Sequence, residues 1–442
     1  MSPENFGAFF ISYMTEFLYK LYKTYHHICT DTRAVNKNAI FFALKGTNFN
    51  GNKFADDALQ KGCSYAVIDE PKYKKDDRYI LVNDVLSALQ DLAMHHRKQL
   101  VIPFIGITGS NGKTTTKELI NVVLQKKYKT FATYGNLNNH IGVPLSVLSV
   151  TDDIEIAIIE MGANHQGEIA HLCEIARPDY GLITNIGKAH LEGFGGLKGV
   201  KKAKGELFDF IRERGGKVFL NADAEVLVEM AGSIPAITYG SYNNCYTSGN
   251  YFAADPYVRL AWSCQAKNAN NIVLETSIVG KYNFSNIMAA ICIGNFFDVE
   301  TEKINEAIKN YAPLNNRSQI VRTEKNTILL DAYNANPSSM EEAIKNFAVM
   351  GGENKVYILG DMLELGAETE AEHQHIINVI NQLNPHRVFL VGTYFPATDN
   401  SFECFLNSEE LKAFLSSQKI IDCNILIKGS RGIKLEKIVE VL

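Results

Sequence analysis

The sequence lacks closely spaced cysteines, long apolar runs and an excess of positive charge. Its eight cysteines stand singly, without the close pairs that zinc sites and redox motifs use, so we expect reduced and mostly buried thiols. No apolar run approaches the roughly 18 residues that suggest a membrane span. Lys and Arg total 44 against 49 Asp and Glu, a formal net charge of −5, which argues against sequence-independent binding to nucleic acid.

The first residues also lack the features of a secretory leader. The stretch MSPENFGAFFISYMTEF has no basic start, carries Glu4 early and has no small-residue cleavage site after its apolar part. We therefore expect a cytoplasmic protein without a membrane segment. The apolar fraction of 46% and the charged fraction of 21% are ordinary for a globular protein, and 442 residues suggest two to four domains.

A glycine-rich stretch has the pattern of a phosphate-binding loop. FIGITGSNGKTTTKELI (Phe104 to Ile120) predicts a strand, a loop and a helix, although the common pattern places a glycine where this chain has Ile107. Backbone N–H groups and the helix start would face phosphate oxygens, with Lys113 adding charge and Thr114 able to bind magnesium. The alternative is an ordinary glycine-rich turn. The expected ATP contacts are Gly109, Ser110, Asn111, Gly112, Lys113, Thr114 and Thr115.

The order of predicted elements divides the chain into three α/β domains. Strand and helix patterns alternate after about residue 100 as a parallel sheet requires, and the pattern resets near Arg317. We predict a small N-terminal α/β substrate domain (1–100), a central parallel-sheet ATPase domain (101–316) and a C-terminal Rossmann-like domain (317–442). The segments expected as strands include 39–44, 65–69, 154–160, 180–187, 327–333, 355–361, 387–392 and 424–430; 84–100 is expected as a helix and 239–256 as a loop or hairpin.

Three polar groups follow predicted buried strands. In open α/β sheets ligands bind beyond the carboxyl ends of the strands, so Lys113 and Thr114, Glu160 and His190 are expected to face one crevice. A carboxylate beside a threonine hydroxyl suits magnesium. A solvated glutamate at a strand end is the alternative for Glu160, and a structural histidine is the alternative for His190.

A lysine-rich helical start, GVKKAKGELF (Gly199 to Phe208), follows this crevice in the sequence. Such a run is usually a solvated basic face. Lys204, however, lies between Ala203 and Gly205, with Leu207 and Phe208 close behind, so its side chain could point inward.

These motifs together resemble the Mur ligase family, ATP-dependent amide-forming enzymes of bacterial cell-wall synthesis. The resemblance covers nearly the whole chain and includes a central and a C-terminal set of motifs. The central set is TGSNGKTTTKE, EMGANHQGEI, TNIGKAHLEGFG and KAKGELF. The C-terminal set is NNRSQ, DAYNANPSSM, LGDMLELG and KGSRG.

The resemblance implies a reaction that passes through an acyl phosphate. YNANPSSM and GDMLELG are similar to the branch of the family that joins D-alanyl-D-alanine to UDP-N-acetylmuramoyl-tripeptide, giving the pentapeptide precursor of peptidoglycan. It implies ATP and Mg²⁺ as cofactors and these two small molecules as substrates. We expect the protein to be a monomer. The alternatives are a ligase of the family that adds a single amino acid, a folylpolyglutamate synthase, or a generic phosphate-loop ATPase or kinase.

The same resemblance implies roles for individual residues. Lys113, Glu160, His190, Lys204 and Arg317 would be catalytic, with Thr114 and Glu160 at one magnesium and His190 near a second. Lys204 matches the family lysine that carbon dioxide carbamylates (N6-carboxylation), which would let it bind metal. The remaining implied contacts are Asn283, Asn286, Arg317 and Asp331 for ATP, Asn334 and Asn336 for substrate, and Thr32, Arg33, Lys45 and Gly46 for the UDP-sugar end.

The chain departs from the family pattern at three positions. Asn50 and Asn52 replace an Asp and a His of the N-terminal motif, and Tyr282 stands where His usually precedes Asn283. These departures concern details of the nucleotide contacts. They leave the predicted phosphate and magnesium residues unchanged.

Overall fold

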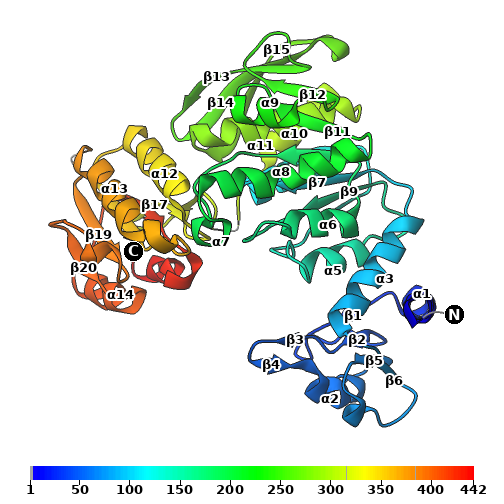
Figure 1. Ribbon diagram of the computed structural model, residues 1–442. Coiled ribbons are helices and arrows are strands. Elements are labelled where there is room, and N and C mark those ends of the chain that lie inside the picture. The colour runs from blue at the N-terminus through cyan, green and yellow to red at the C-terminus, as the bar shows by residue number, and fades with distance from the viewer. Residues whose placement is uncertain (1–2, 315, 384) are drawn as a thin grey trace. The chain divides into compact units, whose positions relative to one another are not determined.

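The computed structural model (Figure 1) describes residues 3–314, 316–383 and 385–442. The chain divides into two compact units. Each unit is an α/β structure and is described by itself. In the described part of the chain, no helix has the length and apolar character needed to cross a membrane. The first unit comprises Met1–Gly106, Tyr128–Gly162 and Glu168–Tyr180; the second comprises Ile107–Lys127, Ala163–Gly167 and Gly181–Leu442.

The N-terminal part of the first unit is a small parallel sheet. Its strands lie in the order β1-β2-β5-β6, and Phe41 in the middle of β2 pairs with Cys29 of β1 and Ala66 of β5. Buried side chains on these strands pack with α2, as the short apolar runs predicted. The elements are β1 (Ile28–Cys29), β2 (Ile40–Phe42), η1 (Gly51–Phe54), α2 (Ala55–Gln60), β5 (Tyr65–Ile68), η2 (Pro71–Tyr73) and β6 (Tyr79–Leu81).

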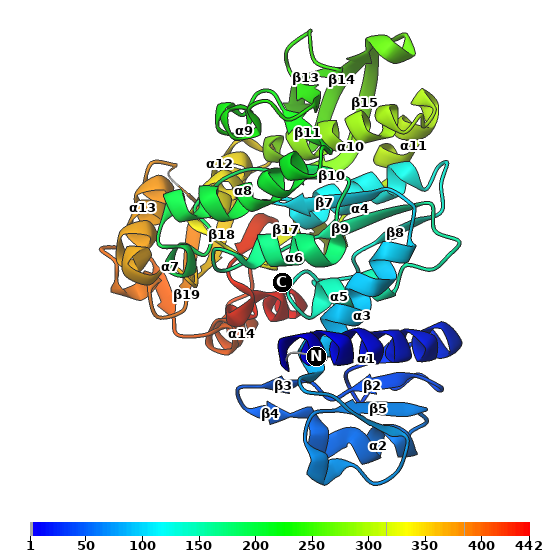
Figure 2. The same ribbon diagram turned by 45° about the vertical axis from the view of Figure 1, so that its right-hand side comes forward.

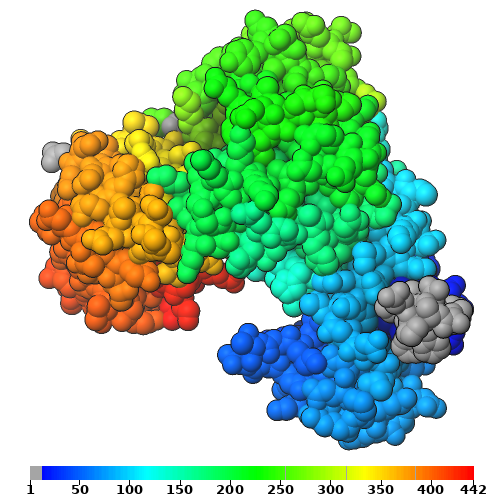
Figure 3. All heavy atoms as spheres, viewed as in Figure 1, coloured from blue at the N-terminus to red at the C-terminus, as the bar shows by residue number. Residues whose placement is uncertain are grey.

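A short hairpin projects from this small sheet. β3 (Lys45–Gly46) pairs antiparallel with β4 (Phe49–Asn50), and the same segment forms the dark-blue projection in Figure 3. The Phe49 and Phe54 rings stack with their centroids 5.2 Å apart while both remain exposed. The hairpin therefore presents polar backbone and aromatic surface together.

The predicted helix at 84–100 is confirmed as α3 (Val85–Gln99). It begins where the Asp84 side chain accepts from the backbone N–H of Ser87 at 2.7 Å, an N-cap that satisfies one of the open amides of the first turn. It packs against α5 (Gly142–Leu148), α6 (Glu168–Ala176) and α1 (Pro3–Tyr25). The helix α1 was not predicted from the sequence.

The first unit also contains the strand that ends at Glu160. β9 (Ile156–Glu160) is buried along its length and pairs parallel with β8 (Thr130–Ala132). A strand with no polar face is what a nearly continuous apolar run predicts. The predicted strand at 154–160 is confirmed within the bounds of β9.

The second unit contains a sheet with strand order β15-β14-β13-β12-β11-β10-β7. β11, β12 and β13 pair in parallel, whereas β13, β14 and β15 pair antiparallel, so the polar stretch at 239–256 forms a hairpin rather than a loop. The strands are β7 (Phe104–Thr108), β10 (Tyr180–Ile183), β11 (Lys217–Asn221), β12 (Ala236–Gly240), β13 (Thr247–Ala254), β14 (Tyr257–Cys264) and β15 (Ala269–Val279).

Helices cover this sheet, as Figure 2 shows. The helix α10 (Phe284–Phe296) is apolar on almost every side and packs against α4 (Lys113–Leu124) and the strands β11 to β13, so it is a buried helix. The other helical elements are α7 (Leu191–Phe194), α8 (Leu197–Glu213), α9 (Glu225–Ala231), η3 (Gln265–Lys267), η4 (Lys281–Asn283) and α11 (Thr301–Asn310).

The C-terminal part of the second unit has its own sheet, in the order β16-β17-β21-β18-β19-β20. All of these strands pair in parallel except β16, as in a Rossmann-like domain. The strands are β16 (Gln319–Arg322), β17 (Asn326–Asp331), β18 (Lys355–Gly360), β19 (Arg387–Val391), β20 (Glu403–Phe405) and β21 (Cys423–Lys428). The helices are α12 (Pro337–Val349), η5 (Gly366–Glu368), α13 (Thr369–Asn381), η6 (Phe395–Ala397), α14 (Ser408–Ser417), η7 (Arg431–Ile433) and η8 (Leu435–Val441).

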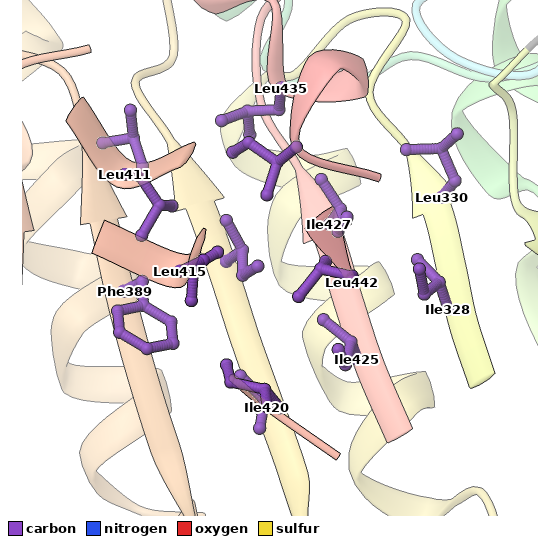
Figure 4. Packing of buried hydrophobic residues seen from close by; sticks show 14 of the residues in the cluster. Ile328, Leu330, Phe389, Leu411, Leu415, Ile420, Ile425, Ile427, Leu435 and Leu442 are labelled. Carbon is purple, nitrogen blue, oxygen red and sulfur yellow. The ribbon is translucent and has the colours of Figure 1, made fainter. Parts of the chain in front are cut away.

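One face of this C-terminal sheet forms a continuous apolar cluster with α14 and η8 (Figure 4). Because successive side chains of a strand point to opposite faces, Ile328 and Leu330 of β17 lie on the same face as Ile425 and Ile427 of β21. Phe389 is fully buried in this cluster. The cluster fixes the register in which the carboxyl ends of these strands stand side by side.

We expect Phe389→Ala to destabilise the C-terminal domain by about 3 to 5 kcal/mol, because it leaves a cavity in this cluster. Calorimetry of the full chain should show the transition of that domain at a lower temperature. Leu406→Ala is the control, since Leu406 is 63% exposed and its truncation should leave that transition in place. An unchanged transition in the Phe389 variant would contradict the prediction.

Candidate active site

The phosphate loop between β7 and α4 is shaped by two glycines with positive φ. Gly109 has φ +143°, and an added Cβ there would collide with the Thr184 hydroxyl. Gly112 has φ +77°, and an added Cβ would stand 2.8 Å from the Asn286 side-chain oxygen. Glycine is therefore required at both positions by backbone conformation and by space.

Residues that follow β10 hold the loop from the side. Thr184 donates its hydroxyl to the backbone oxygen of Asn111 at 2.6 Å, and the Asn185 side-chain oxygen accepts from the Asn111 N–H at 2.9 Å. Ser110 is tied to Gly187 in both directions, since its hydroxyl donates to the Gly187 oxygen and accepts from the Gly187 N–H. The loop is thus a preorganised backbone structure and not an ordinary glycine-rich turn.

The first residues of α4 place a cation and hydroxyl groups beside the loop. Lys113 donates from its ammonium to the Gly109 oxygen at 2.6 Å and to the Ser110 oxygen at 3.3 Å, so its charge lies over the loop. Thr114 is buried, and Thr115 is half-buried. A loop of open backbone, a helix N-terminus and a lysine together suit the phosphates of a nucleotide.

Asn283 and Asn286 lie behind the loop at the start of α10. Asn286 donates to the Asn283 side-chain oxygen at 2.8 Å, and Asn283 donates to the Val279 backbone oxygen at 2.8 Å. Both side chains are buried, and Asn286 closes against Gly112. The structure therefore brings these two predicted residues to the phosphate loop.

His190 follows β10 in a strained conformation. Its φ of +52° places a non-glycine residue in the left-handed region, which is uncommon and often found at functional sites. Its ring forms an ion pair with the partly exposed Glu364 carboxylate and meets the Phe194 ring edge-on at 6.4 Å. The interaction with His190 lowers the pKa of Glu364 below its usual value, against the effect of burial.

Lys204 points inward from α8. This is the second of the two interpretations of its sequence, in which Lys204 does not belong to the solvated basic face. Its side chain is buried, its ammonium donates to the Ala163 oxygen at 3.3 Å and lies 4.9 Å from the centre of the Phe194 ring. His190 and Lys204 therefore share the Phe194 ring as a neighbour. The solvated basic face of α8 consists of other lysines, such as the exposed Lys202.

Glu160 belongs to the first unit, where it is the last residue of β9. Its carboxylate is buried and accepts from the Asn138 side-chain amide at 2.8 Å, while its backbone N–H donates to the Thr133 hydroxyl at 3.0 Å. A buried carboxylate that accepts from the Asn138 amide is not the solvated strand-end glutamate of the alternative interpretation. It is an oriented oxygen donor, of the kind that suits a hard cation.

In the C-terminal domain, the predicted residues gather at the carboxyl ends of the strands. Asp331 ends β17, where one carboxylate oxygen accepts from Lys428 at 2.6 Å and the other from the Ser318 N–H at 3.1 Å. The guanidinium carbon of Arg317, next to Ser318, lies 3.8 Å from the centre of the Tyr333 ring. Arg317 and Asp331 thus belong to one cluster.

Asn336 joins the C-terminal domain to the phosphate loop. Its side-chain oxygen caps α12 by accepting from the Ser339 N–H at 3.0 Å, with Pro337 in the first helical position. Its amide donates to the Asn111 side-chain oxygen at 2.7 Å. Asn334 is exposed, and its side-chain oxygen accepts from the following backbone N–H, as a turn residue does.

Two further polar contacts accompany this junction. The Lys188 N–H donates to the Ser338 hydroxyl at 3.0 Å, and the Lys188 ammonium pairs with the buried Glu372 carboxylate at 2.5 Å. The loop that follows β10 therefore contacts α12 and α13 as well as the phosphate loop.

The predicted substrate residues of the N-terminal domain lie around the β3–β4 hairpin and the loop after β1. Lys45 pairs with the buried Asp69 at 3.0 Å, and an added Cβ at Gly46 would meet open space. Arg33 is exposed and binds the Asp31 carboxylate, which lowers the pKa of Asp31 to about 2. The Thr32 backbone oxygen accepts from Lys61.

The three departures from the family pattern each form a local network. Asn50 caps η1 by accepting from the Asn52 N–H at 3.0 Å, and Asn52 donates to Asp69 at 2.8 Å. Tyr282 is half-buried, and its hydroxyl lies 2.5 Å from the Ser318 hydroxyl, beside Arg317. Burial raises the pKa of Tyr282, so this phenol stays neutral.

Three family descriptions match the chain in succession. "Mur ligase family, catalytic domain" matches residues 24–106, "Mur ligase middle domain" matches 107–294, and "Mur ligase, glutamate ligase domain" matches 316–422. The chain belongs to the Mur ligase family. The phosphate loop of this Mur ligase lies at the start of the middle-domain match, and Arg317 and Asp331 lie in the last.

Relatives of this Mur ligase carry a more specific name. The UDP-N-acetylmuramoyl-tripeptide–D-alanyl-D-alanine ligases of Bacillus subtilis and Escherichia coli are each 34% identical to it, and each alignment covers 94% of this chain and 93% of the relative. MurF from Acinetobacter baumannii has a similar structure, with a TM-score of 0.83 and 28% identity over 94% of this chain and 92% of that one. MurF from Thermotoga maritima, solved with ADP, shares the fold with a TM-score of 0.81 at 24% identity over 94% and 96% of the two chains.

The described residues fit ATP and magnesium by their chemistry. The open backbone at Gly109 and Gly112 and the ammonium of Lys113 suit phosphate oxygens. Thr114 of the second unit and Glu160 of the first are each hard oxygen donors of the kind that magnesium takes. Several residues of this Mur ligase were not predicted to belong to the site. They are Thr184, Asn185, Lys188, Glu364, Lys428 and Ser338; all lie within quoted motifs, but no local pattern distinguishes them from their neighbours.

We expect Gly109→Ala to weaken ATP binding by about tenfold or more, because its methyl group would displace Thr184 and its φ is unfavourable for alanine. Calorimetric titration with ATP measures this. Gly215→Ala is the matched control: Gly215 also has a positive φ, +68°, but an added Cβ there meets open space. Equal ATP affinity in the Gly109 variant and the wild type would show that the contact with Thr184 does not shape the phosphate site.

Proposed function

We propose that this chain is an ATP-dependent ligase that joins D-alanyl-D-alanine to UDP-N-acetylmuramoyl-tripeptide and thereby makes the pentapeptide precursor of peptidoglycan. The observation that carries the proposal is the hydrogen bond between Asn111 of the phosphate loop and Asn336 of the YNANPSSM segment. It brings the residues expected to bind phosphate next to the motif that resembles this branch of the family. The names of the full-length relatives support the same activity.

The reaction needs ATP because a carboxylate is a poor electrophile without a good leaving group. A carboxylate oxygen of the tripeptide attacks the γ-phosphorus, the bond from that phosphorus to ADP breaks, and an acyl phosphate forms. The dipeptide amine then attacks the acyl carbon, the carbon–oxygen bond to phosphate breaks, and the nitrogen loses a proton. The products are the amide, ADP and inorganic phosphate.

The phosphate loop serves the first of these steps. Lys113 and the loop N–H groups from Gly109 to Thr115 stabilise the negative charge on the transferred phosphoryl group, a preorganised electrostatic effect. Asn283 and Asn286 support the nucleotide from the start of α10. Arg317 contacts the phosphates, and Asp331 contacts the ribose or phosphate end of ATP.

Bound magnesium would supply positive charge that reduces the repulsion between the phosphoryl group and the carboxylate that accepts it. Thr114 and Glu160 would hold one ion, and His190 and Lys204 would serve a second. The contact of the His190 ring with the Glu364 carboxylate fixes the histidine ring, as a carboxylate does for histidine ligands in many metal sites.

Lys204 becomes a metal ligand only after carbamylation. The ammonium first loses a proton. The neutral amine then attacks the carbon of carbon dioxide, a nitrogen–carbon bond forms as one carbon–oxygen π bond opens, and the nitrogen loses a second proton, so that a cation has become a carboxylate-like anion. Removal of a lysine side chain from water favours loss of the ammonium proton, and Lys204 is buried. A buried lysine that points inward from α8 therefore supports this modification.

The substrate ends are recognised in different domains. Thr32, Arg33, Lys45 and Gly46 would contact the UDP-sugar end, and Asn334 and Asn336 would contact the peptide or the incoming dipeptide. The chain would act as a cytoplasmic monomer on these small molecules, without nucleic acid or membrane. A generic ATPase activity is less well supported, because Glu160, His190 and Lys204 would then have no evident role in the reaction.

Phosphate release from ATP should require both UDP-N-acetylmuramoyl-tripeptide and D-alanyl-D-alanine, and mass spectrometry should show the pentapeptide product. D-alanine alone should support little release. Lys113→Ala should abolish turnover without changing the melting temperature, because it removes charge from the loop and not from the core. Release that is indifferent to the amine would indicate a generic ATPase, and a product with one added residue would indicate a sister ligase.

Carbamylation of Lys204 should be visible by carbon-13 NMR after incubation with labelled bicarbonate. We expect one carbamate signal in the wild type and none in Lys204→Arg, since an arginine cannot form the carbamate. Lys202→Arg is the control on the same helix, because Lys202 is exposed and its replacement should leave the signal intact. A signal that persists in Lys204→Arg would place the modification elsewhere.

A further inference from the structure

Two arginines flank one tyrosine ring in the C-terminal domain, and we name Arg317, Tyr333 and Arg431 the arginine–tyrosine cluster. The guanidinium carbon of Arg317 lies 3.8 Å from the centre of the Tyr333 ring, and that of Arg431 lies 5.3 Å from it. The Nη1 atom of Arg431 also donates a hydrogen bond to the Tyr333 hydroxyl at 3.5 Å. KGSRG, the motif that contains Arg431, has no role in the reaction as described so far.

The cluster stands at the carboxyl ends of parallel strands. Asp331 and Lys428 are paired in register as the last residues of β17 and β21, and Tyr333 and Arg431 follow them within three residues. Ser430 fixes the second of these loops, since its hydroxyl accepts from the Leu363 N–H at 3.0 Å. This is the edge of an α/β sheet at which ligands bind.

The charges of the cluster are not balanced by a neighbouring carboxylate. Asp331 is already bound by Lys428 and by the Ser318 N–H. In residues 3–314, 316–383 and 385–442, no acidic side chain forms an ion pair with Arg317 or Arg431. Two cations held against one ring attract an anion. The planar guanidinium of arginine offers two parallel N–H donors, which favours carboxylates and phosphates in particular.

The length of the incoming dipeptide indicates which anion Arg431 binds. Asn336 contacts the phosphate loop, and Tyr333 lies three residues before Asn336 in the chain. The segment from Tyr333 to Asn336 therefore spans at most about 10 Å. An extended dipeptide spans about 7 Å from its amine to its carboxylate. A dipeptide whose amine reaches the acyl phosphate beside the loop can thus extend its carboxylate toward the cluster.

We propose that Arg431 binds the C-terminal carboxylate of the incoming dipeptide and that Tyr333 orients its guanidinium. The inference rests on the proposed function. Arg317 is half-buried against the ring and stays with the ATP phosphates, whereas Arg431 is exposed and free to meet a small substrate. A single amino acid is one residue shorter and cannot place its carboxylate on Arg431 while its amine reacts, so the residue selects for a dipeptide.

The test compares D-alanyl-D-alanine with its C-terminal carboxamide in the wild type and in Arg431→Gln. Loss of a charge-assisted hydrogen-bonded pair should raise the KM for the dipeptide by about 10- to 100-fold in the variant. The KM values for ATP and UDP-N-acetylmuramoyl-tripeptide should stay unchanged. The wild type should prefer the acid to the carboxamide by a similar factor, and the variant should lose that preference.

Two more variants complete the design. Arg431→Lys keeps the positive charge but loses the two parallel N–H donors of the guanidinium, so its KM for the dipeptide should lie between those of the wild type and Arg431→Gln. Arg322→Gln is the matched control, since Arg322 is exposed and pairs with Thr327, near the opposite end of β17 from Asp331. It should leave all three KM values unchanged. Melting temperatures verify that each variant is folded.

The outcomes separate this inference from the proposed function. An Arg431→Gln enzyme that keeps the preference for the acid overturns the role of Arg431 while leaving the ligase activity in place. A rise in the KM for ATP instead of the dipeptide assigns Arg431 to the nucleotide and also overturns it. A wild type that releases phosphate but makes no pentapeptide overturns the proposed function, and the inference falls with it.

Discussion

The arrangement of the site depends on how the phosphate loop is held in place. Its two positive-φ glycines leave room for Thr184 and Asn286, and the hydrogen bonds of Thr184 and Asn185 to Asn111 fix the backbone between them. A loop whose N–H groups must face phosphate cannot satisfy its polar groups within itself. Strand-end residues from β10 therefore supply the partners that orient it.

The same loop connects the chemistry of two domains. The Asn111–Asn336 hydrogen bond and the Lys188–Glu372 ion pair tie the phosphate loop and the loop after β10 to the C-terminal domain. His190, in the left-handed conformation, reaches Glu364 of GDMLELG across the same junction. YNANPSSM and GDMLELG, the motifs that resemble one branch of the family, are thus in direct contact with the phosphate loop and with the loop after β10.

The predictable part of the protein was the part encoded in local patterns. Apolar runs predicted β9 and β17, the helical pattern at 84–100 predicted α3, and the Gly-Lys-Thr junction predicted the strand, loop and helix of the phosphate site. The helix α1 was missed. The polar stretch at 239–256, expected as a loop or hairpin, contains β13, which pairs with β14 in a hairpin because sheet pairing outweighed its turn-like composition.

By itself, then, the sequence determined the α/β class, the phosphate loop and the identity of most candidate residues, because these depend on periodicity and on short motifs. Only the tertiary structure decided that Lys204 points inward, that Lys428 pairs with Asp331, and that Arg431 shares the Tyr333 ring with Arg317. These contacts join residues up to about a hundred positions apart. Their geometry follows from strand register and packing, which no local pattern of residues encodes.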